Sequence, residues 1–212
     1  MTSDRLETPE EEKANTWTHA IGIVMSIVAF FILLKTEKIG NQNTLLAIGL
    51  FGFGMLATYV SSTFYHAETN PKRKQILQIC DHISIFLMVG GSYSPFVQLY
   101  IEHDLATFFM SVMWSIIAVG IVLKIFFTGK YDWISVLLYV FLGWMVLFIY
   151  KPMTAAVPTE IFSWIFYGGL SYTVGILFYV WRKLKYSHAI WHVFVLFGTF
   201  CHILALYWSL VK

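Results

Sequence analysis

The sequence predicts an all-α integral membrane protein, a bundle of seven transmembrane helices. Hydrophobic residues make up 58% of the 212 residues and charged residues only 12%, about half the charged fraction of an average soluble domain. The mean hydropathy of +0.69 also indicates that lipid is the main solvent. Apolar stretches of about 20 residues, the length that crosses a hydrocarbon core, recur along almost the whole chain.

Seven stretches are long enough to span a membrane. We predict them at residues 16–34, 43–66, 76–100, 104–124, 131–150, 159–181 and 188–210. Charged or helix-breaking residues separate them, namely KTEKIGNQN, AETNPKRKQ, IEHDL, Gly129-Lys130, Lys151-Pro152 and the basic residues 182–185. The polar residues 1–15 are predicted to be a cytoplasmic tail without a cleavable signal peptide. Residues 16–212 are predicted to form one transmembrane domain.

The charges of the loops predict the direction of the helices. With the N-terminus inside, ten Lys and Arg lie on the inner side and four on the outer side. The inner residues are Arg5, Lys13, Lys72, Arg73, Lys74, Lys124, Lys130, Arg182, Lys183 and Lys185, and the outer ones are Lys35, Lys38, Lys151 and Lys212. Because cytoplasmic loops carry the excess of basic residues, we expect a cytoplasmic N-terminus and an external C-terminus.

The remaining composition narrows the possible functions. The net charge of +2 is small and the basic residues sit in short loops, so we do not expect a nucleic-acid partner. We expect a membrane lipid as the ligand or substrate. Two cysteines, Cys80 and Cys201, argue against a disulfide framework. No segment resembles a nucleotide-binding loop or the Ser-His-Asp order of a serine hydrolase.

Residues of the metal-ligating type gather at the ends of three predicted spans. They lie in SSTFYH, residues 61–66, CDH, residues 80–82, and HAIWH, residues 188–192. The orientation, which rests on loop charges alone, places all three segments in the cytoplasmic leaflet. An ionisable side chain costs on the order of 3 kcal/mol inside a membrane and usually faces the bundle interior. We therefore predict one buried site in this leaflet.

The histidines of these segments predict a zinc site. His188 and His192 are four residues apart and share one helix face. With His66 at the same depth they form a set of three, and three protein ligands plus water is the usual arrangement of catalytic zinc. HAIWH lacks the glutamate of HExxH, so the soluble metalloprotease mechanism does not transfer. The alternative is that the His pair reaches out to the lipid headgroups beside Arg182–Lys185.

Two further residues are predicted to serve chemistry at the metal. Asp81 either ligates zinc or acts as the base for a water molecule that zinc activates, and an ion pair with Lys72–Lys74 is the other interpretation. Ser62, one helical turn before His66, can reach that water or a substrate oxyanion. His82 points about 100° away from Asp81, which favours a supporting or interhelix role.

The expected depth in the membrane decides whether two other histidines can belong to the site. His19, near the start of the first span, belongs to the same layer as the predicted site. His202 follows His192 by ten residues and lies about 15 Å deeper, too far to share the metal. We expect a hydrogen bond from His202 to Tyr93 or Ser94.

These residues together resemble the hemolysin III branch of the progestin and adipoQ receptor family. The resemblance covers nearly the whole chain, through Glu12-Lys-Ala-Asn15-Thr-Trp-Thr-His19, Ser62-Thr-Phe-Tyr-His66, Asp81 and His188-Ala-Ile-Trp-His192. It implies seven helices, a cytoplasmic N-terminus and zinc held by His66, His188 and His192, with Asp81 beside the activated water and Ser62 nearby. The chain is also similar, more distantly, to alkaline ceramidases, which share the Ser, Asp and three-His layout.

The resemblance implies two classes of function. The first is a zinc-dependent hydrolase of the bacterial plasma membrane that cleaves a lipid amide or ester and contributes to membrane-lipid homeostasis. The second is non-enzymatic, either a lipid-sensing receptor or the cytolytic activity that the name hemolysin implies. The predicted spans 104–124, 131–150 and 159–181 hold few ionisable groups inside, which argues against a water-filled pore.

Reporter fusions at the two ends test the predicted orientation. A reporter active only in the cytoplasm is expected to work at the N-terminus, and one active only outside at Lys212, because the basic loops favour the inner side. Exchanging the two reporters provides the control. Both ends on one side would mean an even number of spans and would remove the argument for a shared leaflet.

Overall fold

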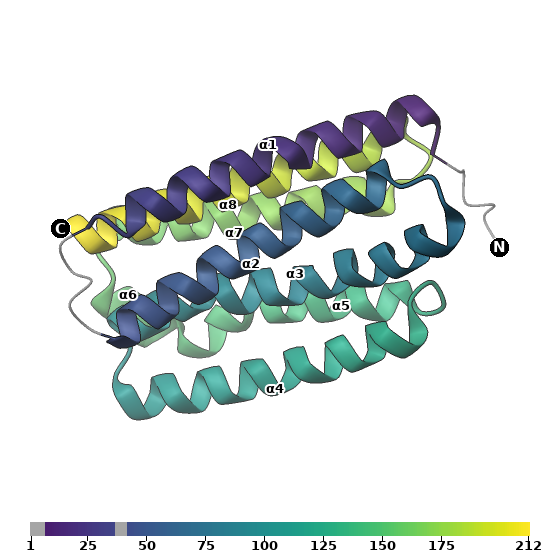
Figure 1. The fold of residues 1–212 in the computed structure, drawn as a ribbon. Helices are drawn as coiled ribbons and strands as arrows, with labels where there is room; N and C mark the ends of the chain where they lie inside the picture. The colour runs from purple at the N-terminus through teal and green to yellow at the C-terminus, as the bar shows by residue number, and fades with distance from the viewer. Residues whose placement is uncertain (1–6, 37–41) are drawn as a thin grey trace.

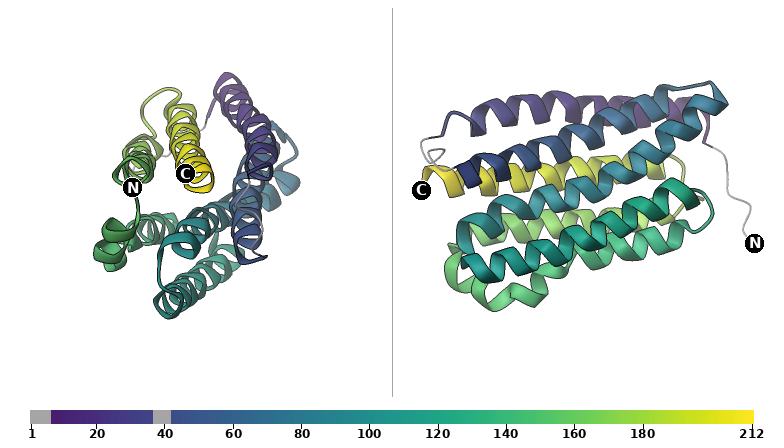
Figure 2. Two further views of the ribbon diagram at one scale, coloured as in Figure 1. Left: turned by 90° about the vertical axis from the view of Figure 1, so that its left-hand side faces the viewer. Right: turned by 60° about the horizontal axis from the view of Figure 1, so that its bottom comes forward.

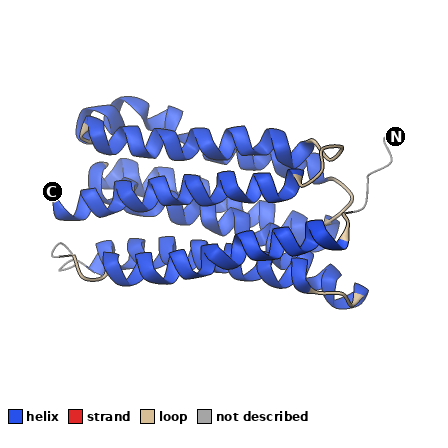
Figure 3. Cartoon of the chain, turned by 90° about the horizontal axis from the view of Figure 1, so that it is seen from above, coloured by secondary structure: helices blue, strands red, loops and turns tan. Residues whose placement is uncertain are grey.

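The computed structural model describes residues 7–36 and 42–212, and in these ranges the chain consists of helices joined by turns (Figure 3). The elements are α1 (Pro9–Leu33), α2 (Gln42–Ala67), α3 (Pro71–Tyr100), α4 (His103–Phe127), α5 (Asp132–Gly143), the 3-10 helix η2 (Met145–Ile149), α6 (Tyr150–Ala156), α7 (Thr159–Val180) and α8 (Ser187–Val211). Within the described ranges, seven helical segments are long and apolar enough to cross a membrane, so the predicted fold class is confirmed. Arg5 and Lys38, which entered the charge count, lie outside the described residues.

The first helix begins earlier than predicted. α1 starts at Pro9, seven residues before the expected boundary at 16, so residues 9–15 are helical. A capping box explains the start: the Glu11 N–H donates to the Thr8 hydroxyl (3.3 Å), and the Thr8 N–H donates to the Glu11 carboxylate (2.9 Å). Pro9 occupies the first helical position, where its missing N–H costs nothing.

The fifth span is interrupted and longer than predicted. α5 gives way to η2, and α6 continues past the break expected at Lys151-Pro152 to Ala156. Pro152 lies in the first turn of α6, where a proline is tolerated. The Tyr93 hydroxyl donates to the Gly143 carbonyl (2.7 Å) and accepts from the Val146 N–H (3.0 Å). These bonds satisfy backbone groups that the interruption frees, as a lipid environment requires.

The helices lie side by side with their axes roughly aligned, and the chain reverses direction from one span to the next (Figure 1). α2 packs along α3, α7 along α8, and α1 against both α2 and α8. Seen along the helices, α4 lies at the edge of the bundle beyond α3 (Figure 2). The Pro9 end of α1 and the Ser187 end of α8 share one end of the bundle, which brings the first and last helices together at the predicted site (Figure 1).

Glycines allow α2 and α3 to approach closely. A Cβ atom added to Gly54 would lie 2.7 Å from the Leu87 carbonyl oxygen, and one added to Gly91 would lie 2.5 Å from the Leu50 carbonyl oxygen. Lipid tails are as apolar as the helices, so association in a membrane depends on close packing, and small residues make it possible. The backbones of α2 and α3, the helices that carry His66 and Asp81, are therefore in close contact.

Alanine at these glycines should destabilise the bundle. Gly54→Ala and Gly91→Ala are each expected to lower the free energy of unfolding by about 1–3 kcal/mol, because a backbone oxygen blocks the added methyl group. Thermal unfolding in detergent micelles measures the effect. Gly49→Ala, on α2 with open space around the added atom, is the matched control and should not destabilise. Wild-type melting of both interface variants would contradict this account.

Candidate metal centre

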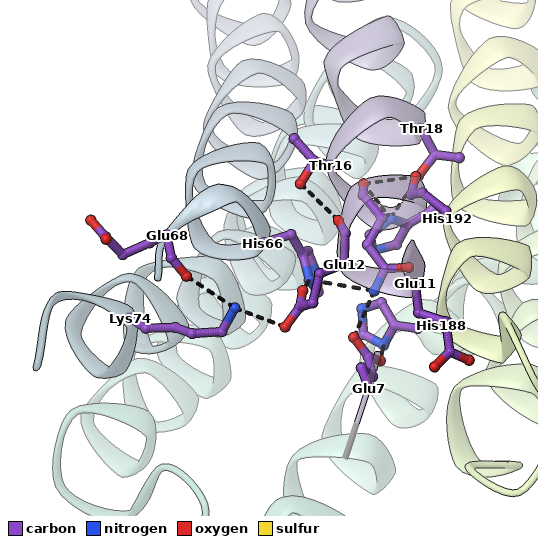
Figure 4. A network of polar contacts seen from close by, with 12 residues as sticks. Glu7, Glu11, Glu12, Thr16, Thr18, His66, Glu68, Lys74, His188 and His192 are labelled. Carbon is purple, nitrogen blue, oxygen red and sulfur yellow. Dashed lines mark hydrogen bonds and ion pairs between the residues drawn. The ribbon is translucent and has the colours of Figure 1, made fainter. Parts of the chain in front are cut away.

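The three predicted histidines form one cluster, at the end of the bundle where α1 begins. His66 comes from the last turn of α2, and His188 and His192 come from the first two turns of α8. One ligand nitrogen from each ring lies within 4.8 Å of the other two. His66 and His192 are 4% and 1% exposed. His66 is thus placed beside a histidine pair that lies more than 120 residues away along the chain (Figure 4).

Helix α1 covers this cluster with a stripe of buried polar residues. Glu11, Asn15 and His19 follow one another at four-residue spacing and are all buried, as expected for one face of a helix. The His19 ring stacks on the His192 ring with 3.5 Å between centroids. His19 therefore lies in the layer that the sequence predicted for it.

The contacts of His66 define which ring nitrogen is available. Its Nδ1 lies 2.6 Å from Oε2 of Glu12, and Oε1 of Glu12 accepts from the Lys74 ammonium at 2.8 Å (Figure 4). An ionised carboxylate can only accept, so Nδ1 of His66 is the donor. Nε2 of His66 is buried and has no hydrogen-bond partner among the described residues. In the neutral ring, that nitrogen carries a lone pair that can bind a ligand.

His192 is held in a similar way. Its Nδ1 lies 3.2 Å from the Asn15 carbonyl oxygen and 3.0 Å from the Thr18 hydroxyl. The Thr18 hydroxyl is within 2.9 Å of the carbonyl oxygens of Ala14 and Asn15 and directs its proton to the backbone. Both partners of Nδ1 are thus acceptors, and Nε2 carries the lone pair.

The Glu7 carboxylate lies close to His188. Its Oε1 lies 3.7 Å from Nδ1 of His188, and its Oε2 accepts from the Asn15 side-chain amide at 2.7 Å. Partial burial raises the pKa of Glu7, while the neighbouring His66 opposes this shift. Glu7, Glu12 and His66 also bring ligand atoms within 4.8 Å of one another, but Lys74 already neutralises part of that negative charge.

Glu11 links the first helix to the loop that delivers His188. Its Oε1 accepts from the Tyr186 N–H at 2.8 Å. Tyr186 directly precedes α8 and has a φ of 59°, a left-handed conformation that is uncommon for a residue other than glycine. The bond from Glu11 thus stabilises an unusual turn immediately before Ser187 and His188.

Asp81 and Ser62 lie beside the histidines. Asp81 is in the third turn of α3 and Ser62 one turn before His66 on α2, and they are 7% and 1% exposed. The Asp81 carboxylate is close enough to Ser62 and His66 to interact electrostatically with both. Asp81 and Ser62 also line a cavity of about 120 Å³ together with His192.

The cluster lies where this cavity meets a polar vestibule. The vestibule, of about 550 Å³, and the cavity share Asp81, His82, Tyr179 and His188. His82 was expected to point away from Asp81, but it lines both spaces. The vestibule walls also carry Glu7, Glu11, Glu12, Lys74 and Arg182. The other end of the cavity is lined mainly by aliphatic and aromatic side chains, among them Ile85, Met88, Val89, Trp144, Ile176 and Val195.

One predicted hydrogen bond is wrong. Nε2 of His202 lies 3.2 Å from the Ile165 carbonyl oxygen on α7, and neither Tyr93 nor Ser94 is its partner. Tyr93 instead binds the interrupted fifth span, and the Ser94 hydroxyl donates to the Gly90 carbonyl within its own helix (2.8 Å). Both hydroxyls bind backbone groups elsewhere, and His202 meets a carbonyl oxygen of the neighbouring helix α7 instead.

The acidic residues at the start of α1 and just before it are the main omission of the sequence analysis. Glu7 and Glu11 were counted as part of a polar tail, and Glu12 entered only through the family resemblance. The pattern Thr8-Pro-Glu-Glu11, a capping box with proline at its first helical position, signals a helix start here. A helix that begins at Pro9 would have placed these carboxylates in the same layer as Asn15 and His19.

Removal of the Glu11 carboxylate should loosen the turn before α8. Glu11→Ala loses a charged hydrogen bond to Tyr186 and one half of the capping box, which should lower the free energy of local opening by about 1–3 kcal/mol. Amide hydrogen exchange across residues 182–190 is expected to accelerate. Lys13→Ala, an exposed change on the same helix, should leave that exchange unchanged. Equal exchange in both variants would show that Glu11 does not hold the turn.

Comparison with known proteins identifies the family of this chain. Residues 8–203 match the family described as Haemolysin-III related. The chain is 38% identical over 193 residues to the Hemolysin-3 homolog of Bacillus subtilis (strain 168), which covers 91% of each chain. It is 36% identical over 191 residues to Hemolysin-3 of Bacillus cereus, covering 90% of this chain and 87% of that protein.

A more distant relative comes from animals. The Monocyte to macrophage differentiation factor of Homo sapiens is 26% identical over 203 residues, covering 93% of this chain and 83% of that protein. The matched residues extend from the start of α1 into α8 and so include all three clustered histidines. The chain is a multi-pass membrane protein that belongs to the hemolysin III branch of the progestin and adipoQ receptor family.

Proposed function

We propose that the protein is a zinc-dependent hydrolase that cleaves an amide or ester bond of a membrane lipid. The observation that carries this proposal is the position of the histidine cluster and Asp81 at the junction of a polar vestibule and an apolar cavity. Hydrolysis of a lipid needs water from one side and a hydrocarbon chain from the other. This junction supplies both.

The donor set fits zinc. Zinc–imidazole bonds are about 2.0–2.1 Å long, so three nitrogens on one tetrahedral ion lie about 3.4 Å apart. The three nitrogens, within 4.8 Å of one another, need to close in by at most about 1.4 Å. The buried Nε2 of His66 has no other partner in the described part of the chain. When bound by His66, His188 and His192, zinc would supply a Lewis acid that polarises a carbonyl and acidifies water.

The residues around the cluster suit proton transfer and charge stabilisation. Asp81 faces the vestibule as well as the cavity, so its carboxylate can take a proton from an attacking water molecule and pass it to the leaving nitrogen or oxygen. The Ser62 hydroxyl lines the same cavity. It can donate to the carbonyl oxygen as that oxygen gains negative charge.

The lining of the cavity indicates a lipid substrate. Along α8 the cavity extends from His192 to His202, about 15 Å at 1.5 Å per residue. There it meets a second cavity of about 80 Å³, lined by Phe96, Met153 and Phe162 among others. A narrow apolar space of this kind suits an extended hydrocarbon chain and not a compact polar molecule. We place the reaction in a bacterial plasma membrane, with a role in lipid homeostasis, in keeping with the Bacillus relatives.

Two non-enzymatic functions are the alternatives. The names of the Bacillus relatives suggest a cytolytic activity, but the apolar walls of the cavity differ from the polar lumen that a water-filled pore needs. A lipid-sensing receptor would use the same cavity without chemistry. Asp81 discriminates between the classes, because a receptor does not need a base at the end of a lipid chain.

Metal analysis of the purified protein tests the site. One zinc per chain is expected, and the double variant His188→Ala with His192→Ala should lose it, since one ligand cannot hold the ion. His103→Ala, an exposed histidine at the opposite end of the bundle, is the control and should keep the metal. Full retention of zinc by the double variant would exclude this site.

The role of Asp81 is tested by comparing zinc content with lipid turnover. Asp81→Asn should keep most of the zinc but lose activity by about 10- to 100-fold, whereas His66→Ala should lose both. Release of fatty acid from a labelled lipid amide and the matching ester provides the assay. If Asp81→Asn releases zinc like His66→Ala, Asp81 is a ligand. If zinc and turnover both stay at the wild-type level, the hydrolase proposal loses its base.

A further inference from the structure

We propose that helix α1 sets the tautomer of His66 and His192 before any metal binds, with Glu12 as the positioning residue for His66. In both rings Nδ1 would carry the proton and Nε2 the lone pair. The significance for metal binding rests on the zinc-dependent function proposed above. The tautomers themselves are a property of the metal-free chain.

The contact with Glu12 decides the tautomer of His66. Nδ1 of His66 is 2.6 Å from the Glu12 carboxylate, whereas the Asn15 amide nitrogen is 3.5 Å from the same atom. A short hydrogen bond to a charged acceptor outweighs a long contact with a neutral amide. The Asn15 amide also donates to Glu7 at only 2.7 Å. The ring is thus held as a donor at Nδ1.

Lys74 maintains the carboxylate of Glu12 in its accepting role. The two oxygens of Glu12 are divided, with Oε1 toward Lys74 and Oε2 toward His66 (Figure 4). The Lys74 ammonium also reaches the Glu68 carbonyl (3.3 Å) and lies 4.9 Å above the Tyr65 ring centre. These contacts, with Tyr65 on α2 and with Glu68 just after that helix, fix the cation beside Glu12. The cation favours an ionised carboxylate, which cannot donate.

His192 is set by the backbone of the same helix. A carbonyl oxygen can only accept, so the Asn15 carbonyl requires a proton on Nδ1 of His192, and Thr18 accepts as well. The stacked His19 ring covers one face of the imidazole and hinders rotation. Helix α1 therefore fixes the proton position in the imidazole rings of His66 on α2 and His192 on α8.

This arrangement matters because a metal binds only an unprotonated ring nitrogen. With both protons held on the far side of the rings, the ion displaces none of them when it binds to Nε2. Ligating histidines commonly donate their other N–H to a carboxylate or carbonyl, and loss of such a partner costs about 10- to 100-fold in metal affinity. Here both partners are in place in the metal-free protein.

The chain contains an internal control. Nε2 of His202 lies 3.2 Å from the Ile165 carbonyl oxygen, so this buried ring should carry its proton on Nε2. The same measurement should therefore report opposite tautomers for His202 and for His66 and His192.

Nitrogen NMR of the metal-free protein tests the proposal. The chain is labelled with 15N-histidine in lipid nanodiscs, and signals are assigned with His66→Gln, His192→Gln and His202→Gln. Nδ1–H is expected for His66 and His192, and Nε2–H for His202. In Glu12→Ala, His66 should populate both tautomers while His192 and His202 stay unchanged, which also shows that the variant is folded. Glu12→Gln, whose amide oxygen still accepts, should restore Nδ1–H at His66.

Zinc affinity, measured by chelator competition, completes the experiment. Glu12→Ala should weaken binding by about 10- to 100-fold and Glu12→Gln by less, whereas Glu160→Ala, which removes an ion pair with Lys212 at the opposite end, should have no effect. An Nε2–H signal from His66 in the wild type, or no change in Glu12→Ala, overturns the inference even if zinc binds. The expected tautomers in a chain that binds no zinc would uphold it while the proposed function fails.

Discussion

The end of the bundle that holds the histidine cluster depends on polar contacts made by the first three turns of α1. From this short stretch Glu11 binds the turn before α8, Glu12 binds His66 and Lys74, and the Asn15 carbonyl binds His192. Each of these groups would be costly to bury alone in a low-dielectric interior, so the contacts are mutually required. The histidine cluster keeps its present form because α1 supplies hydrogen-bond partners for Nδ1 of His66, for Nδ1 of His192 and for the turn before α8.

The same requirement acts elsewhere in the bundle, with other partners. Where the fifth span changes from α5 to η2, the Tyr93 hydroxyl provides both a donor and an acceptor for the backbone. Where α2 and α3 meet, Gly54 and Gly91 leave room for carbonyl oxygens of the facing helix. Lipid supplies neither hydrogen bonds nor a hydrophobic driving force between helices. Side chains must therefore supply the hydrogen bonds of irregular backbone, as Tyr93 does. Close packing requires that bulky side chains be absent, as at Gly54 and Gly91.

The sequence was sufficient for the features that depend on local pattern. Apolar length predicted the spans, and loop charges independently assigned His66, His188 and His192 to one leaflet, where the structure brings them together. Features that depend on contacts between distant helices were not predictable in this way. The partner of His202 lies on α7, and Glu12 meets a histidine 54 residues away. The early start of α1 was readable from its capping box, but its charges resembled those of a solvated tail.

The division of the cluster between α2 and α8 has a consequence for biosynthesis. A chain emerging from the ribosome inserts α1, α2 and α3 first, and it then carries His66 and Asp81 without the other two histidines. Only when the last helix has been released and has packed against α1 does the set become complete. The nascent chain therefore passes through most of its synthesis with an unfinished centre, and a prematurely terminated product lacks two of the three imidazoles. The set of three histidines can therefore form only after α8 has been translated.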